Sequence, residues 1–175
     1  MEDKAIGILD SHRIMSIATV RPDGWPQNTV VGYANDGLLI YFLVSRASQK
    51  LANIEKDERV AIAVAREPDD VRQIKALFAG ALASEVTDPE QRKHGWKLLL
   101  ERHPNLADYE LPDRSSAAMM RAMCKHVSIL DFSEGLGHTD ELTVGAGGIA
   151  LMEPARTDDW GLSGLKSKTP AEPGE

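Results

Sequence analysis

A short polar segment directly after an apolar run is the part of this chain best suited to binding an anion. The apolar run covers residues 38–44, and a helical pattern begins after it. The polar segment carries hydroxyl, amide and cationic side chains, namely Ser45, Arg46, Ser48, Gln49 and Lys50. The first turn of a helix offers unpaired N–H groups and the positive end of the helix dipole, and both attract phosphate. The segment therefore predicts either a phosphate site or a surface helix cap, formed by Ser48, with solvated cations around it.

A histidine in a glycine-containing segment is the second candidate for chemistry. His138 lies within residues 133–148, where several glycines leave the backbone adaptable. An imidazole has an ordinary pKa of about 6.5, which suits it to donate or accept a proton in a reaction. A histidine in such a loop is also common as a plain surface residue. His138 is therefore a candidate catalytic residue, and a plain surface residue is the alternative.

The other reactive side chains form no recognisable motif. The histidines at positions 12, 94, 103, 126 and 138 match no metal-binding spacing. The chain has no glycine-rich loop of the kind that holds ATP or a dinucleotide. Cys124 is the only cysteine, and a buried inert thiol is expected there rather than a reactive pair with His126. We therefore predict no metal site, no ATP site and no Rossmann fold.

Length and charge restrict the class of protein. The 175 residues fit one domain with a sizeable core, and a hydrophobic content of 42% argues against general disorder. A net charge of −7 disfavours non-specific nucleic-acid binding, which needs a basic excess. The apolar run at 38–44 is too short to span a membrane, and residues 1–4 lack the apolar segment of a secretory signal. We expect a cytoplasmic protein that binds neither nucleic acid nor membrane.

The first part of the chain predicts a helix followed by consecutive strands. Apolar positions over residues 5–9 indicate a short first helix, and β-branched residues over 14–20 indicate a strand. A turn at Pro22-Asp23-Gly24 leads to a partner strand over 27–33. A second turn over 34–37 leads into the apolar run, so we expect a three-stranded antiparallel meander.

The remaining pattern predicts further strands and helices. These elements are a strand ending at Val64, a strand over 77–86, a helix after Thr87, a Met-rich helix over 116–123 and a last strand over 127–132. Gly80 lies inside one strand and indicates either a bulge or a close approach of backbone or ligand. The methionines at 119, 120 and 123 are expected to fill core space. Residues 1–150 are predicted as the folded domain, and 151–175 as an extended or flexible tail.

The order of these pieces resembles a known family. Residues 26–64, PQNTVVGYANDGLLIYFLVSRASQKLANIEKDERVAIAV, are similar to the pyridoxamine 5′-phosphate oxidase-like FMN-binding split-barrel family, and the polar turn at 45–50 is the most specific piece. Residues 130–144, LDFSEGLGHTDELTV, resemble the ending of a flavin-type branch. The resemblance covers about residues 5–145 and implies a mainly β fold, a six-stranded antiparallel split β-barrel with flanking helices. It also implies a homodimer with FMN at the subunit interface.

The resemblance further implies which residues meet the cofactor. The matched positions are Thr29, Val30, Val31, Phe42, Leu43, Ser45, Arg46, Ser48, Gln49, Lys50 and Lys75. Lys50 and Arg46 would meet the FMN phosphate, and the three positions on the second strand would run beneath the isoalloxazine ring. Lys75 stands where the oxidases have a glutamine near the ring, so its ammonium would stabilise negative charge on a reduced flavin. A solvated lysine at a strand edge is the alternative for Lys75.

The chain departs from the oxidases of this family at several positions. Thr29 and Gln49 stand where those enzymes have arginines, and their C-terminal arginine and histidine for pyridoxal phosphate have no counterpart in residues 132–160. We therefore expect FMN-dependent transfer of hydride or electrons from a reduced nicotinamide to a small-molecule acceptor, and not pyridoxamine phosphate oxidation. One alternative is a non-catalytic flavin-binding or stress-related module. Another is a deazaflavin- or haem-using enzyme of the same fold.

Overall fold

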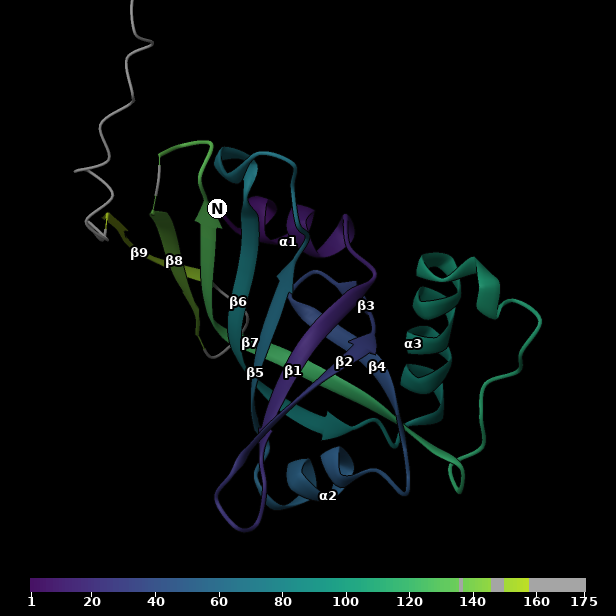
Figure 1. Ribbon diagram of the computed structural model, residues 1–175. Coiled ribbons are helices and arrows are strands. Elements are labelled where there is room, and N and C mark those ends of the chain that lie inside the picture. Colours follow the sequence, from purple (N-terminus) through teal and green to yellow (C-terminus); the bar gives the residue numbers. More distant parts are fainter. Residues whose placement is uncertain (136, 146–149, 158–175) are drawn as a thin grey trace, which may run out of the picture.

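An antiparallel sheet that curls on itself forms the centre of the protein (Figure 1). The computed structural model describes residues 1–135, 137–145 and 150–157. The strands are β1 Ile14–Val20, β2 Pro26–Gly32, β3 Ala34–Asp36, β4 Leu39–Ser45, β5 Arg59–Ala65, β6 Lys75–Glu85, β7 Ala117–Asp131, β8 His138–Val144 and β9 Ala150–Thr157. The helices are α1 Glu2–Asp10, α2 Gln49–Lys56 and α3 Pro89–Arg102, with short 3-10 helices η1 Val71–Gln73 and η2 Pro104–Leu106.

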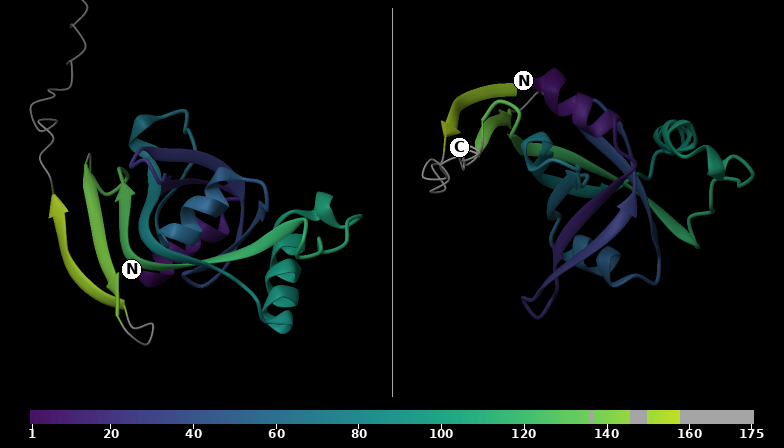
Figure 2. Two further views of the ribbon diagram at one scale, coloured as in Figure 1. Left: turned by 90° about the horizontal axis from the view of Figure 1, so that it is seen from below. Right: turned by 45° about the horizontal axis from the view of Figure 1, so that its top comes forward.

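The strand order explains the curl. Neighbouring strands follow the order β2-β1-β5-β6-β7-β4-β3, and β8 pairs with both β7 and β9. β7 is 15 residues long, so residues 117–123 pair with β4 while residues 126–130 pair with β8. β6 pairs with β7 along its whole length, with a register shift between Gly80 and Ala81. The irregularity lies where the glycine predicted a bulge, but the unpaired residue, Lys125, is on β7. The sheet therefore bends around an interior, which is visible from below in Figure 2.

Alternation of side chains along the strands separates an apolar interior from an outer face. Buried side chains of the interior include Ile17, Phe42, Leu77, Met120 and Ile129. A second, smaller cluster lies where α3 packs outside β4, and it includes Tyr41, Leu99 and Met119. Each such side chain contributes roughly 1.5–3 kcal/mol on burial, so these two clusters hold the sheet and helices together. Met119 and Met120 fill core space as predicted.

Helices α1 and α2 lie at opposite ends of the curled sheet (Figure 1). At the α1 end, Lys4 Nζ lies 3.2 Å from Oδ2 of Asp131, the last residue of β7. At the α2 end, the turn before the helix contacts Glu85, the last residue of β6. β6 has 11 residues, which at a rise of about 3.3 Å per residue separates the two ends by on the order of 30 Å.

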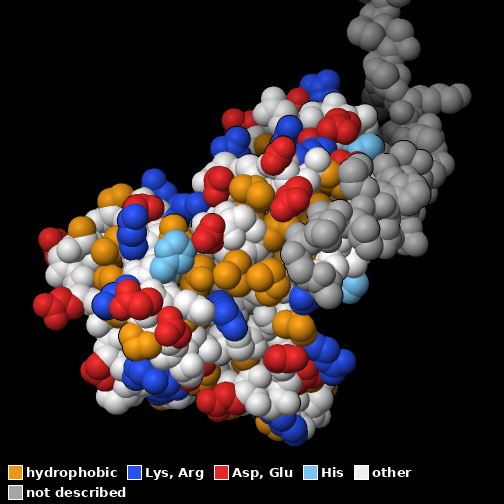
Figure 3. Space-filling model, turned by 180° about the vertical axis from the view of Figure 1, so that it is seen from behind, with side chains coloured by type: hydrophobic (Ala, Val, Ile, Leu, Met, Phe, Trp, Pro, Cys, Tyr) orange, Lys and Arg blue, Asp and Glu red, His pale blue; other side chains and the backbone are white. Residues whose placement is uncertain are grey.

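The surface carries charges of both signs. Acidic and basic side chains are interspersed on the face opposite to that of Figure 1 (Figure 3). None of the helices in the described ranges is both long enough and apolar enough to cross a membrane. Cys124 is buried, and burial raises the pKa of its thiol to about 12, which agrees with the inert thiol expected there.

The predicted helix over residues 116–123 is wrong. Residues 117–123 form the first part of β7 and pair with β4 on one side, and residues 120–123 also pair with β6 on the other. Methionine and alanine favour helices, but two ladders of hydrogen bonds and the burial of Ala118, Met120 and Ala122 outweigh that local preference. The break expected before residue 127 is absent for the same reason.

The predicted three-stranded meander is also wrong, although the mainly β split-barrel class is confirmed. β1 and β2 form the expected hairpin, but residues 34–36 form β3, and β4 pairs with β3 and β7 rather than with β2. The described sheet has nine strands rather than six, because β3, β8 and β9 add to those expected. Residues 151–157 of the predicted tail lie in β9, whereas residues 158–175 lie outside the described residues.

Candidate functional site

The turn before α2 is capped as the sequence predicts. Ser48 is the N-cap residue, and its hydroxyl accepts a hydrogen bond from the backbone N–H of Leu51 at 3.2 Å. Arg46, in contrast, is directed to the sheet, where its Nη1 and Nη2 lie 2.8 and 2.5 Å from the carboxylate oxygens of Glu85. Its Nε donates to the carbonyl of Arg114 at 2.6 Å. Glu85 therefore balances the charge of Arg46 and ties this turn to the end of β6.

Lys50 is the cation of this turn that keeps a free charge. Its side chain is partly buried in the first turn of α2, and burial lowers the pKa of its ammonium. No hydrogen bond or salt bridge engages that ammonium within the described part of the chain. A half-buried cation without a partner is stabilised by an anion, because the anion compensates for the hydration that the ammonium has lost.

A network of amide side chains connects α2 to the β1–β2 hairpin. Asn53 is fully buried, and its Nδ2 donates to Thr19 Oγ1 at 2.9 Å and to Gln27 Oε1 at 3.0 Å. Gln49 donates to Asn53 Oδ1 at 2.9 Å. Thr29 lies two residues from Gln27 on the same face of β2, and its Oγ1 is buried without a hydrogen-bond partner among the described residues.

These observations test whether the α2 end fits a phosphate-bearing cofactor. Lys50 supplies a free positive charge, and the capped start of α2 supplies backbone N–H groups. The residues present at this end therefore fit the phosphate of a flavin mononucleotide.

The structure separates the predicted cofactor-binding positions on β2 and β4. Thr29 and Val31 are partly buried on the inner side of β2, whereas Val30 points outward and is 66% exposed. Phe42 is fully buried in the interior, and Leu43 packs against the cluster beneath α3. Of these five positions, Val30 and Leu43 lie on the outer face of the sheet, and α3 covers that face at Leu43 but not at Val30.

A trough on that outer face is lined by small side chains. Its floor follows one row of paired residues across the sheet, Asn28, Ala18, Ala61, Gly80, His126 and Thr143. The cavity has a volume of about 450 Å³. Neighbouring strands lie about 4.8 Å apart, so the methyl-sized floor on β1, β5 and β6 is about 10 Å wide. A flat floor of this width suits a planar fused ring.

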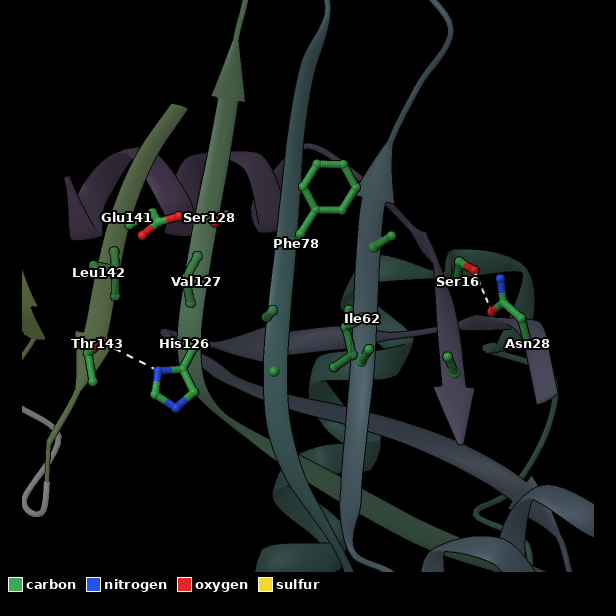
Figure 4. Close-up of a pocket in the computed structure, with 15 residues that line it drawn as sticks. Ser16, Asn28, Ile62, Phe78, His126, Val127, Ser128, Glu141, Leu142 and Thr143 are labelled. Atoms are coloured by element: carbon green, nitrogen blue, oxygen red, sulfur yellow. Dashed lines mark hydrogen bonds between the residues drawn. The ribbon is translucent and has the colours of Figure 1, made fainter. Parts of the chain in front are cut away.

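Polar groups lie at both ends of this floor (Figure 4). At one end, Nδ1 of His126 lies 3.4 Å from Thr143 Oγ1, and Glu141 lies on the neighbouring row. At the other end, Ser16 Oγ donates to Asn28 Oδ1 at 2.7 Å. The ring of Phe78 is 45% exposed beside the floor. The arrangement offers a face for stacking and hydrogen-bonding groups for the edge of a ring.

Lys75 and His138 belong to one network of charged side chains at the α1 end, and they do not contact each other directly. Lys75 Nζ lies 3.2 Å from Asp131 Oδ2, and Lys4 Nζ lies at the same distance from that oxygen. Lys4 also contacts Asp140 Oδ2 at 3.1 Å and Glu134 Oε1 at 2.6 Å. His138 Nε2 completes the network, 3.2 Å from Asp140 Oδ1 and 3.1 Å from Glu134 Oε2.

Contacts within this network favour the charged forms of Asp131 and Lys4. Burial alone would raise the pKa of Asp131, but hydrogen bonds from Ser133, Lys4 and Lys75 bring it down to about 2. Burial alone would lower the pKa of Lys4, but its carboxylate partners raise it above its ordinary value. The ligand atoms of Glu134, His138 and Asp140 lie within 4.8 Å of one another, close enough to hold a metal ion. The ammonium of Lys4 already forms salt bridges with two of these three groups, Glu134 and Asp140.

The predicted site residues therefore fall into separate places. The turn at 45–50 lies at the α2 end, and Thr29 lies opposite Ile17 in the middle of the sheet. Val30 lies by the outer trough, and Lys75 and His138 lie at the α1 end. Because the two ends are on the order of 30 Å apart, one flavin cannot contact both within a single chain.

Sequence reasoning missed the trough and the role of Asn53. The alternating alanines of 59–65 and the glycine at 80 are visible in the sequence. Their meaning depends on which strands are neighbours, and the pairing of β1 with β5 joins segments more than forty residues apart.

The architecture and the family follow from these findings. A curled antiparallel half-barrel closed by helices is a split barrel. The family model described as pyridoxamine 5′-phosphate oxidase matches residues 1–131, and the chain belongs to that family, the FMN-binding split-barrel proteins.

Relatives within this fold carry different descriptions. General stress protein 26 of Bacillus subtilis (strain 168) is 28% identical over 117 residues, which cover 63% of this chain and 82% of that protein. A heme-binding protein from Mycobacterium smegmatis has a TM-score of 0.69 at 20% identity; the match covers 81% of this chain but only 57% of that one. A FAD-binding protein from Mesorhizobium loti has a TM-score of 0.58 at 21% identity, covering 72% of this chain and 91% of that one.

Proposed function

We propose that the protein is a cytoplasmic, FMN-dependent oxidoreductase that transfers hydride or electrons from a reduced nicotinamide to a small acceptor. The observation that carries this proposal is the free, half-buried ammonium of Lys50 at the start of α2. Membership of a family named for a flavin enzyme, and the likeness to a FAD-binding protein, support a flavin.

The α2 end would hold the phosphate. Lys50 balances the phosphate charge, and the N–H groups of the first turn of α2 donate to its oxygens. Arg46 acts through Glu85 by holding the turn in place. FMN, when bound, supplies the redox chemistry, so the protein contributes mainly binding and orientation.

The outer trough would receive the flat ring. Ala18, Ala61 and Gly80 leave room for a ring to lie against the sheet, and Phe78 excludes water beside it. His126 and Glu141 are placed to hydrogen-bond the edge of the ring or the substrate.

A homodimer is part of this proposal. Val20, Val30, Phe78 and Leu82 leave apolar surface on the trough face, with exposed fractions of 44, 66, 45 and 36%. A contiguous apolar patch on a folded protein favours a partner that covers it. The Lys75 and His138 end of one subunit can approach a Lys50 end only in another subunit, because the length of β6 separates the two ends within one chain.

The test of the cofactor is an absorbance spectrum followed by FMN titration. We expect flavin bands, and Lys50→Ala should weaken FMN binding by about 10- to 100-fold, the size of one charge-assisted hydrogen bond. Lys56→Ala is the matched control, because Lys56 lies in the last turn of the same helix. Equal dissociation constants for the wild type and Lys50→Ala would remove Lys50 from the site. A deazaflavin spectrum would replace FMN, and flavin binding without nicotinamide-dependent turnover would leave a stress-related binding module.

Haem binding is a second candidate, favoured by one observation. The exposed imidazole of His126 lies at the end of a flat apolar floor. Haem binding needs an axial ligand for the iron, which an imidazole can supply, and an apolar surface against the planar ring. The Mycobacterium smegmatis protein of similar fold is described as heme-binding. Addition of hemin should then give a sharp Soret band that His126→Ala shifts. A spectrum identical in the variant would exclude His126 as the ligand.

A further inference from the structure

A second cavity lies beneath α1, at the end of the barrel opposite to α2. Its volume is about 500 Å³, and it is bounded by α1, the residue after β5, the start of β6 and the end of β7. Its lining includes His12, Arg66, Gln73 and Lys75. The phosphate site proposed at Lys50 uses none of these residues.

The tautomer of His12 is fixed by its neighbours. His12 Nδ1 lies 2.7 Å from the carbonyl oxygen of Ile8, and a carbonyl can only accept, so in the neutral ring Nδ1 carries the hydrogen. Nε2 is then a bare acceptor. That atom is buried and has no hydrogen-bond partner among the described residues. A ligand that brings an O–H or N–H group into the cavity would satisfy it.

One cation of the lining is free. Lys4 and Lys75 are both committed to Asp131, each at 3.2 Å, and Lys4 also pairs with Glu134 and Asp140. Arg66 has no hydrogen bond or salt bridge within the described ranges, so its guanidinium is available to an anion.

We propose that this cavity binds a small oxyanion of the phosphate class, one that keeps a hydroxyl group at neutral pH. The guanidinium of Arg66 pairs with the anionic oxygens, a geometry that suits its planar fork. The hydroxyl of the oxyanion donates its hydrogen to Nε2 of His12. Lys75 adds to the positive potential while it remains paired with Asp131.

A comparison of phosphate and sulfate affinities distinguishes this arrangement from a simple positive patch. Both are tetrahedral oxyanions, but inorganic phosphate keeps at least one hydroxyl at pH 7.5, whereas sulfate keeps none. Titration calorimetry at constant ionic strength should therefore give phosphate an affinity about tenfold or more above that of sulfate, the worth of one hydrogen bond to a buried acceptor. Equal affinities for the two anions, or no heat with phosphate at millimolar concentration, would overturn the proposal.

Variants locate the site. Arg66→Gln should weaken phosphate binding by about tenfold or more, and Arg59→Gln should leave it within about twofold. Arg59 is the matched control because it lies at the other end of β5, with its side chain 80% exposed and paired with Asp57. An equal loss of phosphate affinity in both variants would show a non-specific effect of surface charge and would contradict the proposal.

Two further measurements distinguish this cavity from the proposed flavin site. Phosphate binding should persist in Lys50→Ala, and FMN affinity should be unchanged in Arg66→Gln. Loss of phosphate binding in Lys50→Ala would assign the anion to the α2 end instead.

Discussion

Arg46 and Glu85 form a two-point salt bridge in which Nη1 lies 2.8 Å from Oε2 and Nη2 lies 2.5 Å from Oε1. The bridge joins the turn before α2 to the last residue of β6. Its carboxylate also faces Arg114 at 3.3 Å, and these cations lower the pKa of Glu85. The relationship changes the role expected of Arg46, because a guanidinium bound on two sides is not free to hold a phosphate.

Replacement of Arg46 should therefore affect folding more than cofactor binding. Arg46→Gln is expected to lower the urea midpoint of unfolding slightly, since the pair is partly exposed and Glu85 keeps Arg114 nearby. FMN affinity should change by less than about threefold. Urea unfolding and flavin titration of the same preparation measure both quantities. A loss of FMN affinity as large as that of Lys50→Ala would return Arg46 to the phosphate site.

The outer face gives a direct test of the dimer. Val30→Asp places a charge on the apolar trough face, where desolvation of a carboxylate would oppose association. Sedimentation should then give the 19.1 kDa monomer, whereas the wild type should give twice that mass. Val71→Asp is the control, because Val71 is 58% exposed but lies in η1, away from the trough. A dimer that survives Val30→Asp would place the interface on another face.

His138 remains a candidate for proton transfer, with its Nε2 between two carboxylates. We expect His138→Gln to leave FMN affinity nearly unchanged and to slow nicotinamide-dependent turnover by about tenfold or more. His94→Gln is the matched control, because His94 also faces a carboxylate, Asp36 at 2.9 Å, but lies on α3. If turnover survives in His138→Gln while the unfolding free energy falls, the residue only stabilises the contact of α1 with β8.

The sequence predicts local features well where a residue's chemistry acts within a few positions. Ser48 caps its helix as expected, and the register of β6 and β7 shifts next to Gly80. Prediction from the sequence fails where pairing between distant segments determines the secondary structure. Residues 117–123 have helix-forming side chains, yet pairing with β4 and β6 makes them a strand. Lys50 and Lys75 were grouped in one site, and the strand order places them at opposite ends of the barrel.

Two helical glycines provide a matched test of how α3 is seated. A Cβ built on Gly95 would lie 2.8 Å from Tyr41 Cδ1 and 3.3 Å from Met119 Sδ, and both of those side chains are buried. A Cβ on Gly7 in α1 would meet nothing within 4 Å. Alanine favours a helix over glycine by about 1 kcal/mol, so the two replacements differ only in their surroundings.

We expect Gly7→Ala to raise the free energy of unfolding by about 0.5–1 kcal/mol. Gly95→Ala should lower it by about 1–3 kcal/mol, because the added methyl group forces the ring of Tyr41 or the whole helix to move. Urea denaturation of both variants at one pH measures the difference. Equal gains in stability would mean that Tyr41 repacks without cost, and that the close approach of α3 to β4 does not depend on glycine.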